Sequence, residues 1–156
     1  IQDAANEGAT LLLDGRNPHV DGCENGYYVG PTILDNVRPE MKIAKEEVFG
    51  PVLSIIRTSN VNDAISVQHG SDYGNGAAVF TQNGKAARDI AGKLKAGMVG
   101  INIGVPVPRE PYSFGGWNDS KFGVGDITGK SSIQFWTELK KVTSKWNPED
   151  QKDWMS

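Results

Sequence analysis

Regular alternation of apolar runs and amphipathic segments in the middle of the chain constrains its fold more than any other feature. Residues 52–57, 76–81 and 98–103 read VLSIIR, GAAVFT and MVGINI, and such continuous apolar runs predict buried strands. Residues 60–69 and 83–97 lie between these runs and carry apolar residues at helical spacing. Strands that alternate with helices of this length favour crossover connections. We therefore predict an α/β fold with a mostly parallel sheet flanked by helices.

The first residues read as the last turns of a helix. Ile1, Ala4 and Ala5 fall on one helical face, and Gly8 follows as a terminator. Residues 9–13, ATLLL, then predict a strand. Because no capping residue precedes the helix, we expect this chain to be a C-terminal piece of a longer protein.

Asparagine and glycine predict the ends of the helix within residues 83–97. Asn83 is a residue type that accepts hydrogen bonds from the first free amides of a helix, and Gly97 is a typical terminator. Further on, residues 123–132 read GVGDITGKSS, but their glycine spacing fits neither a P-loop nor a dinucleotide fingerprint. This segment predicts a glycine-rich turn that leads into an element capped by Ser131 or Ser132.

Composition excludes several classes of function. Sixteen Lys and Arg against nineteen Asp and Glu give a net charge of −3, so nucleic acid is not an expected partner. No apolar run approaches the length of a membrane span. The single cysteine, Cys23, favours a reducing compartment, and we expect a cytoplasmic protein. His19 and His69 are far apart in sequence, so no metal site is predicted.

Two side chains, those of Cys23 and Arg109, are candidate functional groups by residue type. Cys23 stands between Asp21 and Glu24, whose charges disfavour the thiolate that a nucleophile needs, so a structural role in a surface turn is favoured. Arg109, in a proline-rich loop, could pair with a carboxylate or phosphate, but a solvated loop residue is the favoured interpretation. No catalytic residue is assigned within the chain.

The segment KEEVFGP, residues 45–51, places an acid and an aromatic residue directly before a Gly-Pro turn. A turn needs neither. A carboxylate such as Glu47 can accept hydrogen bonds from both hydroxyls of a ribose, and an aromatic such as Phe49 can pack on the adjacent ring. In an extended segment these two side chains share a face. The alternative is a surface acid beside a core aromatic.

Four collinear segments resemble the aldehyde dehydrogenase superfamily. They are residues 26–55, GYYVGPTILDNVRPEMKIAKEEVFGPVLSI; residues 75–102, NGAAVFTQNGKAARDIAGKLKAGMVGIN; the SFGG of residues 113–116; and the terminal FWTELKKVT, residues 135–143. The resemblance implies the C-terminal part of that family's catalytic domain. It implies that Glu47 holds the nicotinamide ribose of NAD, that Phe49 packs against the nicotinamide riboside, and that Phe114 lines the substrate tunnel.

Two departures from the common family pattern are similar to the coenzyme A-acylating branch, the methylmalonate-semialdehyde dehydrogenases. Ser113 replaces the proline that most members carry before Phe114, and residues 118–130 lack the usual Arg-Glu pair. That branch oxidises malonate or methylmalonate semialdehyde to acetyl-CoA or propionyl-CoA through a cysteine thioester. The resemblance places the nucleophile and the NAD-binding domain before Ile1, so this chain alone is expected to be inactive.

The terminal segment is expected to mediate assembly. Residues 1–130 are assigned to the catalytic domain, and residues 131–156 to an oligomerisation strand and tail. The resemblance implies that the strand pairs with a neighbouring subunit, giving a dimer or a dimer of dimers. The alternative for residues 137–146, which carry three lysines, is an exposed edge strand. For the chain as a whole, the alternatives are an inert folded module and a hydrolytic aldehyde dehydrogenase.

Overall fold

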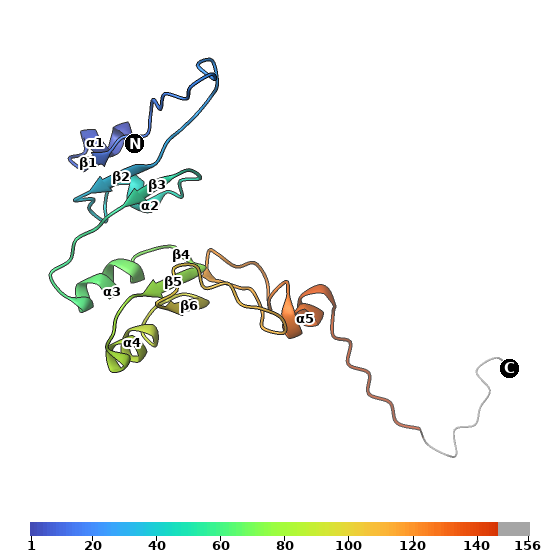
Figure 1. The fold of residues 1–156 in the computed structure, drawn as a ribbon. Coiled ribbons are helices and arrows are strands. Elements are labelled where there is room, and N and C mark those ends of the chain that lie inside the picture. The colour runs from blue at the N-terminus through green and yellow to red at the C-terminus, as the bar shows by residue number, and fades with distance from the viewer. Residues whose placement is uncertain (147–156) are drawn as a thin grey trace. The chain divides into compact units, whose positions relative to one another are not determined.

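A computed structural model describes residues 1–146 and divides the chain into two compact units. The first unit comprises Ile1–Val107 and Gly115–Lys121, and the second comprises Pro108–Phe114 and the chain from Phe122 onward. Figure 1 traces this order by colour along the ribbon. The predicted tail, residues 147–156, lies outside the described residues.

Short helices and strands alternate along the first unit, so its mixed α/β character is confirmed. In chain order the elements are α1 (Gln2–Asn6), β1 (Thr10–Leu13), β2 (Thr32–Asp35), α2 (Lys42–Lys45), β3 (Val52–Ser54), α3 (Val61–His69), β4 (Tyr73–Gly74), β5 (Gly76–Val79), α4 (Gly84–Ala91), β6 (Met98–Ile101) and β7 (Trp117–Asn118). The predicted first helix and the strand after it therefore form as α1 and β1, and Gly8 between them has a positive φ of 102°.

A three-stranded sheet in the order β1-β2-β3 carries the main apolar core. β1 and β2 pair antiparallel, while β2 and β3 pair parallel with Thr32 opposite Val52. Leu34 of β2 is fully buried and packs in a cluster with Ala4, Ala9, Val37 and Met41. The same cluster therefore fixes α1 and the start of α2 against the sheet.

The β5–β6 pair is parallel, with Ala77 opposite Val99, and α4 crosses between the two strands and packs on both. Asn83 caps α4 as predicted, because its side chain accepts hydrogen bonds from the amides of Lys85 and Ala86. The predicted terminator was wrong. The helix ends at Ala91 with Gly92 as its C-cap, five residues before Gly97.

The prediction of a mostly parallel sheet needs correction. Three small sheets are present among residues 1–146, and two of their four strand pairs, β1–β2 and β4–β7, are antiparallel. Both parallel pairs have a helix in their connection, as the alternating pattern requires: α2 precedes β3, and α4 precedes β6. The antiparallel pairs join segments for which the sequence showed no such alternation.

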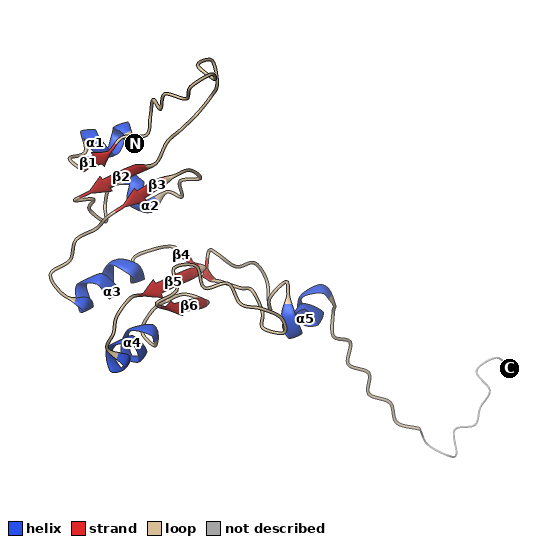
Figure 2. Cartoon of the chain, in the orientation of Figure 1, coloured by secondary structure: helices blue, strands red, loops and turns tan. Residues whose placement is uncertain are grey.

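In the second unit, a short 3-10 turn, η1 (Gly129–Ser131), leads into α5 (Ser132–Trp136). Figure 2 shows tan loop on both sides of these elements. The predicted glycine-rich turn is confirmed, since Gly123, Gly125 and Gly129 all have positive φ. Residues 137–146 are exposed and contain no hydrogen-bonded strand, so their predicted strand is not formed among residues 1–146.

Candidate functional site

The loop that carries Glu47 and Phe49 is anchored at both of its ends. On one side, Met41 is buried at the N-cap of α2, and the helix runs to Lys45 directly before the loop. On the other side, the carbonyl of Pro51 accepts a 2.8 Å hydrogen bond from the amide of Thr32 at the start of β2. Both anchors belong to the β1-β2-β3 layer, so the loop extends from a packed core.

Phe49 lies at the middle of a three-residue turn. The Gly50 amide donates to the Val48 carbonyl at 3.1 Å, and the Val52 amide donates to the Gly50 carbonyl at 2.8 Å. The segment is therefore not extended throughout. The prediction that the Glu47 and Phe49 side chains share a face had assumed an extended segment. The Phe49 side chain is 92% exposed, which excludes a core aromatic within the described chain.

Glu47 is also exposed, and no hydrogen bond or ion pair engages its carboxylate within residues 1–146. It borders a hollow of about 160 Å³ that Asp3 and Lys42 also line. The Lys42 ammonium lies 3.7 Å from the carboxylate of Glu46 and 3.9 Å from that of Asp3. The neighbouring acid is thus paired, whereas Glu47 is left open to a ligand.

Phe114 belongs to the second unit, so it is described separately from Glu47 and Phe49. Its side chain is 38% exposed, and its amide donates a 2.9 Å hydrogen bond to the Thr128 hydroxyl. The preceding residue, Ser113, places its hydroxyl 2.9 Å from that of Ser131. Two contacts from the turn around η1 therefore hold the backbone beside Phe114.

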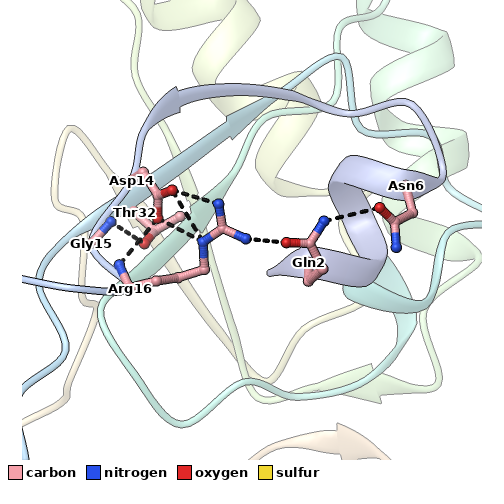
Figure 3. A network of polar contacts seen from close by, with 6 residues as sticks. All are labelled: Gln2, Asn6, Asp14, Gly15, Arg16 and Thr32. Atoms are coloured by element: carbon pink, nitrogen blue, oxygen red, sulfur yellow. Dashed lines mark hydrogen bonds and ion pairs between the residues drawn. The ribbon is translucent and has the colours of Figure 1, made fainter.

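A polar network missed by the sequence reasoning closes the neck of the long loop between β1 and β2 (Figure 3). The Arg16 guanidinium contacts both oxygens of Asp14 and also the side-chain oxygen of Gln2. The hydrogen bond from Arg16 lowers the pKa of Asp14 to about 2. Beside it, the Gly15 amide donates to the Thr32 hydroxyl at 3.1 Å.

Glycine is required at the centre of this neck. A Cβ on Gly15 would lie 2.0 Å from the carbonyl oxygen of Gly30, to whose amide the Gly15 carbonyl is hydrogen-bonded at 2.7 Å. The paired glycines bordering residues 16–29 were the visible signal. The network is structural, because it joins α1, β1 and β2 and leaves its charged groups paired with one another.

The remaining candidates lie where the favoured interpretations put them. Cys23 is exposed in a loop closed by hydrogen bonds between Val20, Cys23 and Gly26, and Arg109 is exposed in its proline-rich segment. Residues 1–146 contain no cluster of three or more His, Cys, Asp and Glu side chains suited to a metal ion. Within the same residues, no helix combines the length and the apolar character of a membrane span.

A sequence model of the aldehyde dehydrogenase family matches residues 1–142. The chain belongs to this family. Among its relatives, the acylating methylmalonate-semialdehyde/malonate-semialdehyde dehydrogenase of Rattus norvegicus mitochondria is 48% identical over 150 residues, which is 96% of this chain and 28% of the relative. A malonate-semialdehyde dehydrogenase of Pseudomonas aeruginosa is 42% identical over 146 residues, covering 94% of this chain and 29% of that protein.

Solved structures agree with this assignment. A methylmalonate-semialdehyde dehydrogenase of Sinorhizobium meliloti, complexed with NAD, aligns with a TM-score of 0.85 at 44% identity, over 97% of this chain and 31% of that one. The corresponding enzyme of Oceanimonas doudoroffii aligns with a TM-score of 0.86, over 94% of this chain and 30% of that one. The chain therefore spans less than a third of the length of these relatives.

Proposed function

We propose that this chain is the C-terminal part of an NAD-dependent, coenzyme A-acylating aldehyde dehydrogenase. The whole protein would oxidise methylmalonate or malonate semialdehyde to propionyl-CoA or acetyl-CoA. The main observation in support of this proposal is the 42–48% sequence identity, over 94–96% of the chain, to dehydrogenases named for these semialdehydes. In this proposal the nucleophilic cysteine and the NAD-binding domain lie in the rest of that protein, and Cys23, which is exposed in a loop, is not the nucleophile.

In this proposal Glu47 and Phe49 form the wall of the cofactor site that faces the nicotinamide ribose. Their environment fits that task. The Glu47 carboxylate has free lone pairs for two ribose hydroxyls, and the Phe49 ring exposes nearly all of its surface for packing. NAD, when bound, accepts the hydride; these side chains only orient it. The rigid anchors at Met41 and Pro51 limit how far the loop can drift.

Phe114 would line the tunnel through which the aldehyde reaches the nucleophile. Its partly exposed ring can give that tunnel an apolar wall. Residues 137–146 would pair with a neighbouring subunit, because their backbone has no strand partner among the described residues and Leu139, Val142 and Trp146 expose apolar surface. We place the protein in the cytoplasm. The mitochondrial names of the mammalian relatives make the matrix the alternative compartment.

The test is product analysis with the purified full-length protein. Malonate semialdehyde, NAD and coenzyme A are expected to give NADH and acetyl-CoA in equal amounts, with loss of carbon dioxide. Free acid with NADH, unaffected by coenzyme A, would identify a hydrolytic dehydrogenase instead. If neither this aldehyde nor its 2-methyl analogue reduces NAD, the inert-module alternative is favoured and the proposal fails.

A further inference from the structure

We propose that three hydroxyl groups, those of Ser113, Thr128 and Ser131, act as a clamp that positions Phe114 and thereby sets the selectivity between aldehydes. We call them the hydroxyl clamp. The inference deepens the proposed function, on which it rests for the role of Phe114 as a tunnel wall. None of the three residues is assigned to catalysis or to cofactor binding above, and all lie in the second unit.

The Thr128 hydroxyl is used in an unusual way for its position. Thr128 is the N-cap residue of η1, where a threonine side chain ordinarily accepts a hydrogen bond from the turn that follows. No such capping bond is made. The hydroxyl instead accepts the Phe114 amide at 2.9 Å, across fourteen residues of sequence. The Thr128 hydroxyl thus binds the backbone of Phe114 and not the turn that follows Thr128.

Ser113 and Ser131 form a hydrogen-bond chain with a defined direction. The Ser131 hydroxyl lies 2.9 Å from that of Ser113 and 3.4 Å from a carboxylate oxygen of Asp126, and it accepts the Asp126 amide at 3.2 Å. An ionised carboxylate can only accept, so Ser131 donates to Asp126 and Ser113 donates to Ser131. Hydrogen bonds in such a chain polarise and so strengthen one another, and removal of one hydroxyl is expected to weaken the rest.

Gly129 brings the two segments into contact. It has a positive φ of 65°, and a Cβ there would lie 2.8 Å from both the amide nitrogen and the hydroxyl of Ser113, and 2.9 Å from the Pro111 carbonyl oxygen. Only glycine permits this approach. The turn that holds Thr128 and Ser131 is therefore built to lie directly on residues 111–114.

Ser113 connects the hydroxyl clamp to substrate selectivity. Proline at this position would have no hydroxyl to donate to Ser131, and it would hold the backbone through its ring instead. With serine, the position of Phe114 depends on hydrogen bonds to a separate turn. A shift of the Phe114 ring changes the width of the tunnel beside its apolar wall. The tunnel width in turn sets the discrimination between a substrate and its homologue with one more methyl group.

The experiment uses the full-length protein and four variants: Thr128→Val, which keeps the shape but loses the hydroxyl; Thr128→Ser, which retains it; Ser131→Ala; and the control Ser132→Ala. The Ser132 hydroxyl donates to the Gly129 carbonyl and does not contact residues 111–114 through any hydrogen bond described for residues 1–146. The readouts are kcat/KM for malonate semialdehyde and for methylmalonate semialdehyde, KM for NAD, and hydrogen exchange of the peptide containing Phe114.

Loss of one such hydrogen bond is expected to change the ratio of the two kcat/KM values by about three- to tenfold in Thr128→Val and Ser131→Ala. KM for NAD should stay within about twofold, and Thr128→Ser and Ser132→Ala should resemble the wild type. Exchange at the Phe114 amide should accelerate in Thr128→Val. An unchanged ratio in Thr128→Val and Ser131→Ala, or an unchanged exchange rate in Thr128→Val, would overturn the clamp.

The two proposals fail in different ways. A wild-type protein that reduces no NAD with either aldehyde refutes the proposed function, while exchange at Phe114 still decides whether the clamp holds the backbone. An active wild type whose selectivity ignores the hydroxyls refutes the clamp alone. If Thr128→Val does not fold, Ser131→Ala and its neighbour control Ser132→Ala give the same comparison without altering Thr128.

Discussion

Two adjacent glutamates show how closely spaced residues of one type come to differ. Glu46 follows α2 and shares the Lys42 ammonium with Asp3, while the Glu47 carboxylate has no partner among the described residues. Exposed ion pairs contribute little to stability, so the pairing of Glu46 matters mainly for where its side chain points. Glu47 is thereby the acid whose carboxylate remains without a partner among residues 1–146.

The first prediction concerns Glu47→Gln in the full-length protein, with Glu46→Gln as the matched control. Glutamine offers one acceptor oxygen in place of two, so the nicotinamide should be held less firmly. Misplacement of about 1 Å can cost around a hundredfold in rate, so we expect hydride transfer to be slower by about ten- to a hundredfold. Single-turnover measurement of NADH formation checks this. Wild-type rates in Glu47→Gln, or equal losses in both variants, would refute the role.

The second prediction concerns Cys23. Its side chain is exposed in a loop closed by backbone hydrogen bonds, and no backbone hydrogen bond described for residues 1–146 joins this loop to the segment that carries Glu47. Cys23→Ala should therefore leave aldehyde oxidation within about twofold of the wild type, as expected for exposed positions. A fall of several orders of magnitude in turnover would instead make Cys23 the nucleophile.

The sequence suggested a chemistry for the candidate site but did not predict its geometry. The pairing of an acid with an aromatic residue at positions 47 and 49 suggested a nucleoside, and their roles toward NAD stay a prediction. The sequence did not reveal the turn centred on Phe49, because Gly50 and Pro51 are sufficient by themselves to predict a turn. The hydroxyl clamp depends on contacts across fourteen to eighteen residues of loop, which no local pattern reports.

At the scale of elements, strong periodicity of apolar residues predicted α3, α4, β5 and β6. It did not predict β2, because buried polar residues interrupt the apolar pattern of that strand. Thr32 and Asp35 bracket this strand and are only 1% and 6% exposed, yet their side chains read as polar. They can be buried because the Thr32 hydroxyl accepts a hydrogen bond from the Gly15 amide and the Asp35 carboxylate forms an ion pair with Arg57. Such distant partners cannot be identified from local sequence.

The error at Gly97 has a similar origin. A Cβ there would lie 2.3 Å from the carbonyl oxygen of Gly115, and the Gly97 amide donates to the Gly74 carbonyl at 2.9 Å. Glycine is therefore required at this position by close packing at the start of β6, and not by the end of a helix. Gly92 had the same chemistry and stood closer to the last turn of α4.

The third prediction concerns the acid sensitivity of the β2–β3 pair. Hydrogen bonds from the Arg57 guanidinium and the Asn36 amide lower the pKa of Asp35 below its ordinary 3.8. The stability this gives is present above about pH 4 and is lost as pH falls through the lowered pKa. Asp35→Asn should therefore lose stability near neutral pH but show a shallower decline as the pH falls below about 4.

Urea denaturation midpoints measured across that range would check the prediction. Arg57→Gln serves as a second arm, since it removes the main cause of the shift and should also flatten the decline. A wild type and variants with parallel pH profiles would show that the Asp35–Arg57 pair does not couple folding to protonation.

At the scale of the whole molecule, much apolar side-chain surface is not used by the described contacts. Phe80 and Ile103 in the first unit, and Phe122, Val124 and Ile133 in the second, are all more than half exposed. Surface of this kind commonly marks a site of further packing. It supports the proposal that the chain works as part of a longer polypeptide and a multimer.

The fourth prediction is that removal of residues 137–146 reduces the oligomeric mass of the full-length protein. A cut after Trp136 keeps α5 intact, together with the hydrogen bond from the Trp136 indole to the Ile127 carbonyl. A cut after Trp146 is the matched control. Light scattering should show a smaller species for the first variant only. Native mass in both would indicate that these residues are an exposed edge without a role in assembly.

The central claim, that this chain supplies one wall of a cofactor site whose remainder lies elsewhere in the protein, is tested most directly by calorimetry. NAD would be titrated into residues 1–156 alone and, in parallel, into the full-length protein. The full-length protein is expected to bind NAD with a dissociation constant on the order of micromolar to millimolar, as is usual for enzyme ligands, and the shorter chain is expected to give no measurable heat of binding. Equally tight binding by residues 1–156 would contradict the claim.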